Sequence, residues 1–358
     1  MSVIEDVLAY EIWLRSKCDV VDEGLREKHR RMAKDPFKFL RATCFRFART
    51  MPKYLPDLTT APLVPSVGDA HIENWGTWSD AEGRLVWGVN DFDDAALLPF
   101  TYDLVRLATS ARLAPGIAGA SNDRSAWILS GYLAGLEQPK PWILDGSQPW
   151  MRMLLGRPMT KVGIADDASI SWVRQGDLPP EIVQALLEHL PSGTSQPVFA
   201  TRQRGGGSLG RPRYLVMGKW RGGSVWREAK ALVPSAWDWA LDLQGQPGQA
   251  LLLAEGRYRS PDPFLDIRSG YMIRRIAPDS EKIDLTDGDA AAFGCDVLAA
   301  MGGDLAAIHL SGNTDSAALQ ADLRLRKKTW LDVSAELAAQ EVSADFEKWQ
   351  GYTKRYMG

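Results

Sequence analysis

The first fifty residues place apolar side chains at helical spacing. They recur every three or four positions from Glu5 to about Met51, as expected for helices that bury one face. Asp35 and Pro36 interrupt this pattern; Asp can cap a helix, and Pro can occupy the first turn of a new one. The segment therefore predicts two consecutive helices, with the second beginning near Pro36.

Similar periodicity predicts further helices along the chain. Those after the first fifty residues are expected at 101–113, 125–136, 181–190, 249–258 and 287–310. The last of these is rich in alanine, so its small side chains allow close packing against a neighbour. His309 lies at its end and is interpreted as structural.

Alternating or continuous apolar runs bounded by turn residues predict strands. These strands are expected at 84–89, 213–217, 224–230 and 271–276. Turn-forming residues at 79–84 lead into the first of them, so that it would return beside the preceding segment. Helices and strands together indicate the α+β class.

Composition limits the classes of function. The 358 residues are 45% hydrophobic and 24% charged, which is ordinary for a globular chain long enough for two lobes. The net charge of -3 gives no reason to expect nucleic acid as a partner. Three widely spaced cysteines argue against a disulfide framework and a cysteine-only zinc site. An acidic N-terminus without a long apolar run predicts a cytoplasmic protein without a membrane anchor.

The first candidate site combines a loop with a hairpin. Asp69 lies five residues before Asn74, and Asp91 follows the predicted hairpin. Phosphotransferases need a carboxylate to orient the acceptor hydroxyl and oxygen ligands to hold magnesium. Asp69 is therefore the candidate base, Asn74 and Asp91 are candidate Mg²⁺ ligands, and Asp93 is a further candidate for the metal. The alternative is that these residues only cap loops.

The second candidate site is a glycine-rich turn between two predicted strands. Its residues are Gly205, Gly206, Gly207, Ser208, Leu209 and Gly210. Glycines allow main-chain amides to approach phosphate oxygens closely. A dinucleotide-binding fold would need a helix directly after these glycines, whereas a strand is expected here. The other alternative is a flexible hairpin whose glycines serve only turn geometry.

The catalytic segment resembles a known superfamily. Residues 68–74, 90–95 and 99–104 are similar to the Gly-Asp-x-His-x-x-Asn, Asp-Phe-x-Asp-Ala and Tyr-Asp-Leu motifs of aminoglycoside and choline kinase-like phosphotransferases. The whole chain more closely resembles the uncharacterised bacterial domain-of-unknown-function family numbered 2252, through residues 31–41 and 227–236. That family is grouped with protein-kinase-like folds. The resemblance implies ATP and Mg²⁺ as cofactors but names no acceptor.

Kinase logic also implies roles for a lysine and a glutamate. Lys230 follows an alanine in the predicted strand 224–230, as in the kinase Val-Ala-x-Lys pattern, and is favoured over Lys219 for binding phosphates. Glu255 in the next predicted helix is the candidate partner that would orient Lys230 through an ion pair.

The chain order is inverted relative to kinases, because Asp69 and Asp91 precede Gly205 and Lys230. A circularly permuted, two-lobed fold would reconcile this order. Residues 1–140 would form large-lobe helices and the catalytic hairpin, 141–280 the small nucleotide-binding lobe, and 281–358 helices that return to the large lobe. This arrangement predicts that Lys230 lies across a cleft from Asp69 and Asp91.

Three functions fit these patterns. The favoured one is an ATP- and Mg²⁺-dependent phosphotransferase that acts on a small-molecule hydroxyl or a protein acceptor. The second is a nucleotide-binding pseudokinase or a nucleotidyl transferase. The third is a metal-dependent phosphoesterase, a class that usually needs more histidine ligands than the four histidines of this chain supply.

Overall fold

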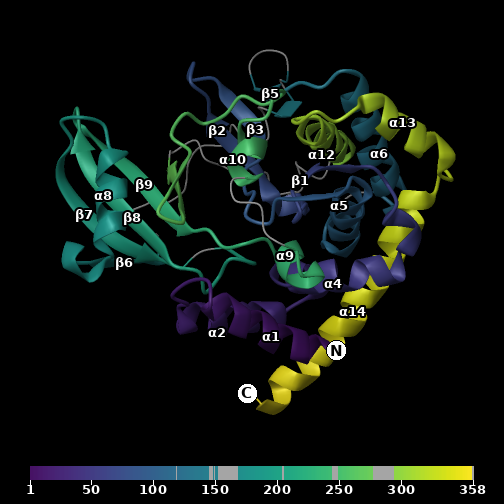
Figure 1. Cartoon of the computed structure of the whole chain (residues 1–358), viewed down its shortest axis with the longest axis horizontal. Helices are drawn as coiled ribbons and strands as arrows, with labels where there is room; N and C mark the ends of the chain where they lie inside the picture. The colour runs from purple at the N-terminus through teal and green to yellow at the C-terminus, as the bar shows by residue number, and fades with distance from the viewer. Residues whose placement is uncertain are drawn as a thin grey trace.

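The computed structural model describes residues 1–117, 119–144, 148, 150–151, 168–203, 205–243, 249–276 and 294–356. Within these residues, strands form sheets of two, three and six strands, and the remaining elements are mainly helices. The six-stranded sheet lies to one side of a larger, mainly helical part (Figure 1). The mixed α and β composition predicted from the sequence is confirmed.

The N-terminal segment forms four helices rather than the predicted two. They are α1 (Val3–Arg15), α2 (Asp22–Met32), α3 (Pro36–Ala42) and α4 (Cys44–Tyr54). The predicted boundary is correct, because a carboxylate oxygen of Asp35 accepts from the main-chain nitrogen of Lys38 at 2.8 Å. The additional breaks follow Arg15 and Ala42, and at the second the Thr43 hydroxyl donates to the Phe39 carbonyl.

Two antiparallel strand pairs carry the first candidate site. β1 (Leu63–Ser66) pairs with β4 (Ala96–Pro99), and β2 (Trp75–Ser79) pairs with β3 (Leu85–Val89) after the short turn η2 (Ile72–Asn74). β5 (Trp142–Ile143) extends the second pair along β3. Asp80 fixes the hairpin turn, because its Oδ1 accepts from the main-chain nitrogens of Glu82 and Arg84. The predicted return strand is confirmed, and it brings residue 91 back beside Asn74.

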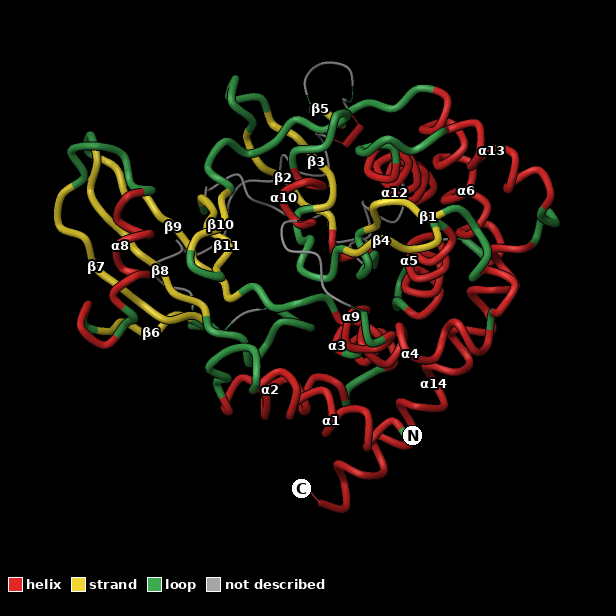
Figure 2. The backbone as a smooth tube through the Cα atoms, viewed as in Figure 1, coloured by secondary structure: helices red, strands yellow, loops and turns green. Residues whose placement is uncertain are grey.

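Long helices lie beside this hairpin, on the side away from the six-stranded sheet (Figure 2). They are α5 (Thr101–Leu113), α6 (Ser121–Glu137), α12 (Gly294–His309), α13 (Ser316–Leu325) and α14 (Trp330–Tyr356). Small residues let α6 and α12 pack closely, since a Cβ added at Gly302 would lie 2.0 Å from the Ile128 carbonyl oxygen. This agrees with the packing predicted for the alanine-rich helix; the predicted start of that helix, 287–293, lies outside the described residues.

The large sheet is antiparallel throughout, in the order β10-β11-β9-β8-β7-β6. Its strands are β6 (Ile170–Val173), β7 (Ser195–Arg202), β8 (Arg213–Trp220), β9 (Gly223–Ala231), β10 (Asp266–Arg268) and β11 (Tyr271–Arg275). Helix α8 (Pro180–Glu188) covers one face, where Ile182 and Leu186 pack with Val216 and Ala229. Side chains alternate along a strand, so Glu228 and Lys230 project from the other face.

Two short helices connect the large sheet to the helical body. α9 (Ala236–Leu241) and α10 (Gln249–Ala254) both contribute to the main hydrophobic core, through Trp237 and Leu253. α10 ends four residues before the predicted end at Tyr258. Among the described helices, none combines the length and apolar character needed to span a bilayer.

Candidate functional site

Asp103 fixes the position of the Asp69 loop through hydrogen bonds to its main chain. The two carboxylate oxygens of Asp103 accept from the main-chain nitrogens of Val67 and Gly68, at 2.6 and 2.9 Å. His309 Nε2 lies 3.1 Å from Asp103, and His309 Nδ1 lies 2.8 Å from the Tyr132 hydroxyl. His309 is fully buried in this network, which agrees with its predicted structural role.

Gly68 is required where the loop turns toward Asp69. Its φ is +76°, a conformation that L-residues with side chains rarely adopt. A Cβ at this position would lie 1.9 Å from the main-chain oxygen of Asp94. The Asp69 loop and the segment after Asp91 are therefore in direct main-chain contact.

Asp69 itself is ion-paired with a buried arginine. Arg106 Nε donates to Asp69 Oδ1 at 2.7 Å, and its Nη2 contacts the same oxygen. His71 Nε2 lies 3.9 Å from the other Asp69 oxygen. Arg106 comes from α5 and is inaccessible to solvent, so it fixes the orientation of the Asp69 carboxylate.

Asn74 joins the loop to the hairpin. Its side-chain nitrogen donates to the main-chain oxygens of Asp69 and Asp91, at 3.1 and 3.0 Å. The carbonyl oxygen of the side chain is therefore the Asn74 atom that could serve a cation. Asn74 is buried, so it positions the two aspartates in addition to any role with metal.

Lys230 lies against the Asp91 hairpin. Its Nζ is 3.0 and 2.9 Å from the two carboxylate oxygens of Asp91, and it also contacts Asp93. Lys230 is buried, whereas the Asp91 side chain is 40% exposed. Lys230 was expected across a cleft from Asp69 and Asp91; it instead contacts Asp91 directly, and Asp91 keeps an open side toward solvent.

The two carboxyl groups at Lys230 differ in their pKa. Desolvation alone would raise the pKa of Asp91, but the Lys230 ammonium, the hydrogen bonds with Asp93 and Lys230 and the charge of Arg213 together outweigh it and hold this pKa below its usual range. Burial, and then the negative charge of Asp91, raise the pKa of Asp93. Asp93 also accepts from Arg211 Nη1 at 2.9 Å. Two cations thus neutralise Asp93, so of this pair Asp91 is the better placed to face a metal ion.

The glycine-rich turn lies over the Asp69 loop. Gly205 and Gly210 have φ of +109° and +91°. Gly205 accepts from Arg31 Nη1 at 2.9 Å, and a Cβ at Gly207 would lie 3.9 Å from Asp69 Oδ2. Leu209 is buried, which anchors the turn to the core. The turn therefore meets the segment that carries the candidate base.

Arg41, on α3, also borders this turn. Its guanidinium contacts Glu73, and it is the nearest group to a Cβ added at Gly206, at 3.4 Å. From the sequence, Arg41 could either lie on a solvated face or reach toward the phosphate site, and the structure places it beside the glycines.

Two predicted candidates do not join the site. Glu255 is exposed and follows the last residue of α10, while the carboxylates that bind Lys230 are Asp91 and Asp93. The expected ion pair between Lys230 and Glu255 is therefore wrong, because the helix ends before Glu255 and the hairpin carboxylates already hold the lysine. Lys219 is exposed and donates to Ser224 at the far end of the sheet.

A cleft of about 220 Å³ separates the large sheet from the hairpin. Asp91 and Phe92 line it on the hairpin side, and Gly205, Arg213 and Arg274 line it on the sheet side. Arg259 closes one wall; its Nη2 donates to the Val89 carbonyl at 2.6 Å, and its Nη1 lies 3.2 Å from Asp304. Arg213 and Arg259 each keep a buried Nε without a hydrogen-bond partner. Two arginines that line the cleft therefore keep unpaired donors.

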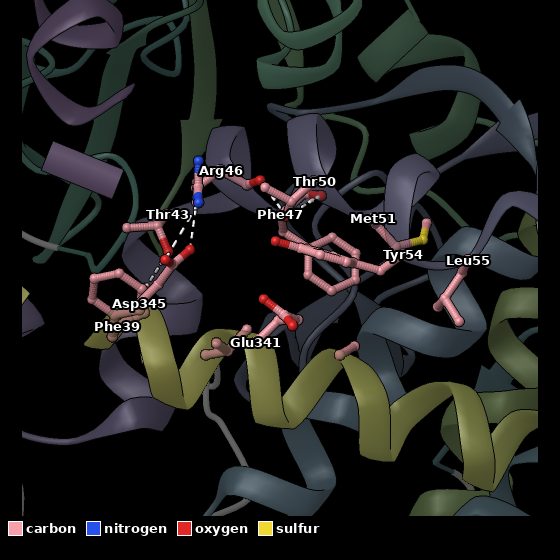
Figure 3. A pocket seen from close by; sticks show the side chains of 12 residues that line it. Phe39, Thr43, Arg46, Phe47, Thr50, Met51, Tyr54, Leu55, Glu341 and Asp345 are labelled. Atoms are coloured by element: carbon pink, nitrogen blue, oxygen red, sulfur yellow. Dashed lines mark hydrogen bonds and ion pairs between the residues drawn. The ribbon is translucent and has the colours of Figure 1, made fainter. Parts of the chain in front are cut away.

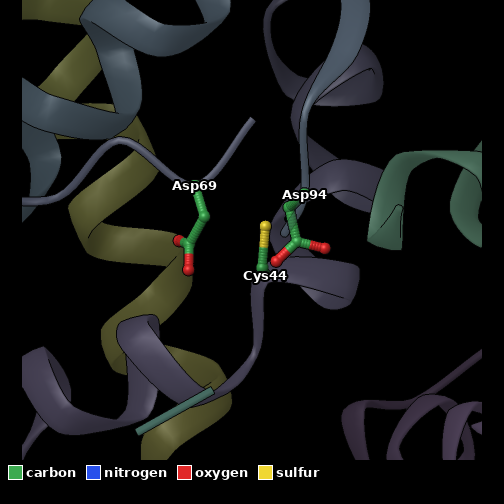
Figure 4. Close-up of side chains that lie close together, drawn as sticks. All are labelled: Cys44, Asp69 and Asp94. Atoms are coloured by element: carbon green, nitrogen blue, oxygen red, sulfur yellow. The ribbon is translucent and has the colours of Figure 1, made fainter. Parts of the chain in front are cut away.

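Cys44, Asp69 and Asp94 lie within 4.8 Å of one another at their ligand atoms (Figure 4). Their contacts favour packing over metal binding. Burial raises the pKa of the Cys44 thiol well above its usual range, and this thiol donates to the Gly68 carbonyl. Asp69 is occupied by Arg106, and Asp94 Oδ1 accepts from the main-chain nitrogen of Ala236.

A smaller hollow of about 20 Å³ lies between α3, α4 and α14 (Figure 3). Arg46 borders it and donates to Asp345 Oδ2 at 2.7 Å. A space of this size has room for about one water molecule. It therefore offers no substrate site.

The sequence interpretation gave no role to Arg106, Arg211 and Arg213. Arg106 lies three residues after Asp103, hence on the same side of α5 as the residue that holds the loop. Arg211 and Arg213 flank Pro212 directly after the glycine-rich turn. Their positions beside the two motifs could have indicated that they belong to the site. Their carboxylate partners could not be predicted, because these lie far away in the chain.

Comparison with known proteins gives one match. Residues 20–138 match the family described as "Uncharacterized protein conserved in bacteria (DUF2252)". The matched segment includes the Asp69 loop and the Asp91 hairpin and ends before the glycine-rich turn and Lys230. No curated protein and no solved structure matches the chain significantly. The expected resemblance is thus confirmed for residues 20–138, where the chain is similar to this uncharacterised bacterial family.

Proposed function

We propose that this protein is an ATP- and Mg²⁺-dependent phosphotransferase of the protein-kinase-like type, with an unidentified small-molecule hydroxyl or protein side chain as acceptor. The observation that carries the proposal is the contact of Lys230 with Asp91 at the edge of a 220 Å³ cleft. Kinases hold a nucleoside triphosphate with a lysine and a metal-binding aspartate that meet beside a glycine-rich loop.

Residues in the cleft and beside it fit these cofactors. Asp91 presents a partly exposed carboxylate and Asn74 a side-chain carbonyl oxygen, both of which suit Mg²⁺. The main chain of Gly205–Gly210 and the ammonium of Lys230 would hold phosphate oxygens. Bound ATP with Mg²⁺ would supply the phosphoryl group. Asp93 and Arg211 then act indirectly, because they hold Lys230 at the hairpin.

Asp69 takes the role of the residue that orients the acceptor hydroxyl. Its carboxylate lies beneath the glycine-rich turn, and Arg106 holds one of its oxygens. The second oxygen is then the one that can accept a hydrogen bond from the acceptor. In this proposal the large sheet forms the small lobe and the helical body the large lobe, in circularly permuted order.

One observation favours a second candidate, a nucleotide-binding protein with altered catalysis. The buried guanidinium of Arg106 binds Asp69 directly and occupies one of its two carboxylate oxygens, which leaves less of that carboxylate open to an acceptor hydroxyl. Nucleotide binding through Lys230 and Asp91 would be kept. The phosphoesterase alternative gains no such support, since His29, His189 and His309 bind carboxylates away from the cleft.

Thermal unfolding with and without ATP and Mg²⁺ tests the proposal. A ligand that binds the folded protein raises its unfolding temperature. We expect a rise for the native chain and for Lys219→Ala, an exposed lysine of the same sheet, and a much smaller rise for Asp91→Ala. Each variant is compared with its own ligand-free state. No rise in the native chain would overturn the proposal.

Transfer of labelled γ-phosphate separates the two candidates. If the protein is a phosphotransferase, the native chain should hydrolyse ATP or transfer its γ-phosphate. Asp69→Asn should lose most of this activity but still bind the nucleotide. Binding without any turnover would instead select the second candidate.

A further inference from the structure

Three arginines surround one buried glutamate on the sheet face of the cleft. Glu228 is fully buried and accepts from Arg213 Nη1 at 2.9 Å and from Arg274 Nε and Nη2 at 2.9 and 2.7 Å. Arg202 Nη1 lies 3.4 Å from the second oxygen of Glu228. All three arginines line the cleft. The carboxylate therefore organises guanidinium groups that a ligand in the cleft can reach.

The cluster carries more positive than negative charge. Leaving Arg202 aside, Arg213 and Arg274 share the single carboxylate of Glu228, and within the described part of the chain it is their only ion-pair partner. Glu228, with smaller contributions from Asp91 and Asp93, already stabilises the Arg274 guanidinium and raises its pKa. The two guanidinium groups still share one directly bound carboxylate, so the pair keeps a net positive charge that attracts an anionic ligand.

Both arginines retain donors for such a ligand. Arg213 donates to Glu228 and to the Ser208 hydroxyl, which leaves its buried Nε without a partner. The Arg213 side chain is only 5% exposed. Arg274 uses Nε and Nη2 on Glu228 and is 32% exposed, so its Nη1 can meet a ligand from the cleft. Planar guanidinium groups of this kind suit phosphate oxygens.

The position of the cluster distinguishes it from the Lys230 site. Glu228 lies two residues before Lys230 on the same face of β9, and Arg213 is opposite Lys230 on β8. Arg274 is opposite Glu228 on β11. The arginines therefore extend the row of cations from Lys230 across the sheet, and a charged surface of this kind suits phosphates better than an apolar nucleobase.

We propose that Arg213 and Arg274, held by Glu228, form a second phosphate-binding subsite in the cleft, beside Lys230 and Asp91. The ligand of the cleft thus carries phosphate groups at both places. The second phosphate comes either from the polyphosphate chain of the nucleotide or from a phosphorylated acceptor. The subsite deepens the proposed function and rests on it for the role of Lys230, but phosphate binding at the arginines can be measured separately.

Inorganic tripolyphosphate without added metal is the probe. We expect it to bind the full-length native chain in calorimetry, and to bind Arg274→Gln about tenfold more weakly through loss of a charged hydrogen bond. Arg268→Gln is the matched control, because Arg268 lies on the adjacent strand β10 and its side chain is 60% exposed. No Glu228 variant is used as a test, because replacing Glu228 would leave the buried arginines without their carboxylate partner.

Equal binding by native chain, Arg274→Gln and Arg268→Gln, or no binding to the native chain, would overturn the subsite. Competition then identifies the source of the phosphate: displacement of tripolyphosphate by ATP supports the nucleotide, and simultaneous binding supports a phosphorylated acceptor. Failure of the proposed function can be distinguished from failure of the subsite. If only the proposed function is wrong, Asp91→Ala leaves ATP binding unchanged, while the binding of tripolyphosphate still depends on Arg274.

Discussion

Lys230 and Asp91 form a direct ion pair although 139 positions separate them in the chain. The pair joins the central part of the large sheet to the end of the β2–β3 hairpin. Because Asp93 and Arg211 belong to the same cluster, the contact is a junction of alternating charges rather than an isolated bridge. The stability of this junction can be tested without knowledge of any ligand.

Replacement of Lys230 by methionine should destabilise the protein by about 3 kcal/mol, because it leaves buried carboxylate charge without its partner. Urea unfolding followed by fluorescence measures this change. Lys219→Met, on an exposed part of the sheet, should stay within about 0.5 kcal/mol of the native chain. Addition of Asp93→Asn to Lys230→Met should restore part of the loss, and a strictly additive double variant would contradict the coupling.

Gly68→Ala should be far more destabilising than Gly83→Ala. Both glycines have a positive φ, so both variants suffer backbone strain of about 1–2 kcal/mol. Only at Gly68 would the new Cβ also meet the Asp94 main chain, whereas a Cβ at Gly83 would have no neighbouring atom within 4 Å outside the adjacent residues. Chemical denaturation of the two variants compares them directly. Equal losses would show that the Asp69 loop tolerates separation from Asp94.

Lys28 predicts a distinctive pH dependence of stability. Burial lowers its pKa to about 8, and its Nζ lies 5.6 Å from the ring centroids of Tyr10 and Phe45. Since the unfolded chain keeps this lysine protonated up to its ordinary pKa of 10.5, the folded state gains stability as the pH rises from about 8 to 10.

The native chain should therefore gain on the order of 1 kcal/mol per pH unit relative to Lys28→Met across that interval. Comparison of the two chains at each pH cancels the contributions of tyrosines and cysteines that titrate in the same range. A constant difference in unfolding free energy from pH 7.5 to 10 would show that the Lys28 pKa is not lowered.

The three cysteines should differ in their rate of alkylation. Cys44 is 5% exposed and its raised pKa keeps it as a thiol, whereas Cys295 is partly exposed on α12. Iodoacetamide labelling followed by mass spectrometry should modify Cys295 at least about tenfold faster than Cys44. Burial also raises the pKa of Cys18, so this residue should react more slowly than Cys295. Rapid labelling of Cys44 in the folded protein would reopen the case for a reactive thiolate beside Asp69 and Asp94.

Local patterns were sufficient to predict much of the fold. The helix at 101–113 has the predicted bounds, and β3, β9 and β11 agree with predicted strands to within one residue at each end. These elements combine strong periodicity with clear turn or capping residues, such as Asp35. The end of α10 was placed four residues too late, because only tertiary packing decides where that short helix stops.

The contacts of the site were harder to predict than its elements. The kinase motifs, combined with a permuted chain order, predicted that Lys230 and Asp91 lie near each other. The partners of the arginines had no such guide: Arg211 meets Asp93 across 118 positions, and Arg106 meets Asp69 across 37. Sequence spacing carries no signal for ion pairs between separate elements. The expected partner of Lys230 was correspondingly placed at Glu255 instead of at Asp91 and Asp93.

The support of the Asp69 loop has a consequence for biosynthesis. Trp237 Nε1 donates to the Gly68 carbonyl, His309 contacts Asp103, and Asp304 accepts from the main-chain nitrogen of Val89. A ribosome that has completed the first 140 residues has therefore not yet supplied the side chains that close this loop. These residues stay incompletely packed until α12 emerges, so we expect their apolar surface to remain exposed during that interval.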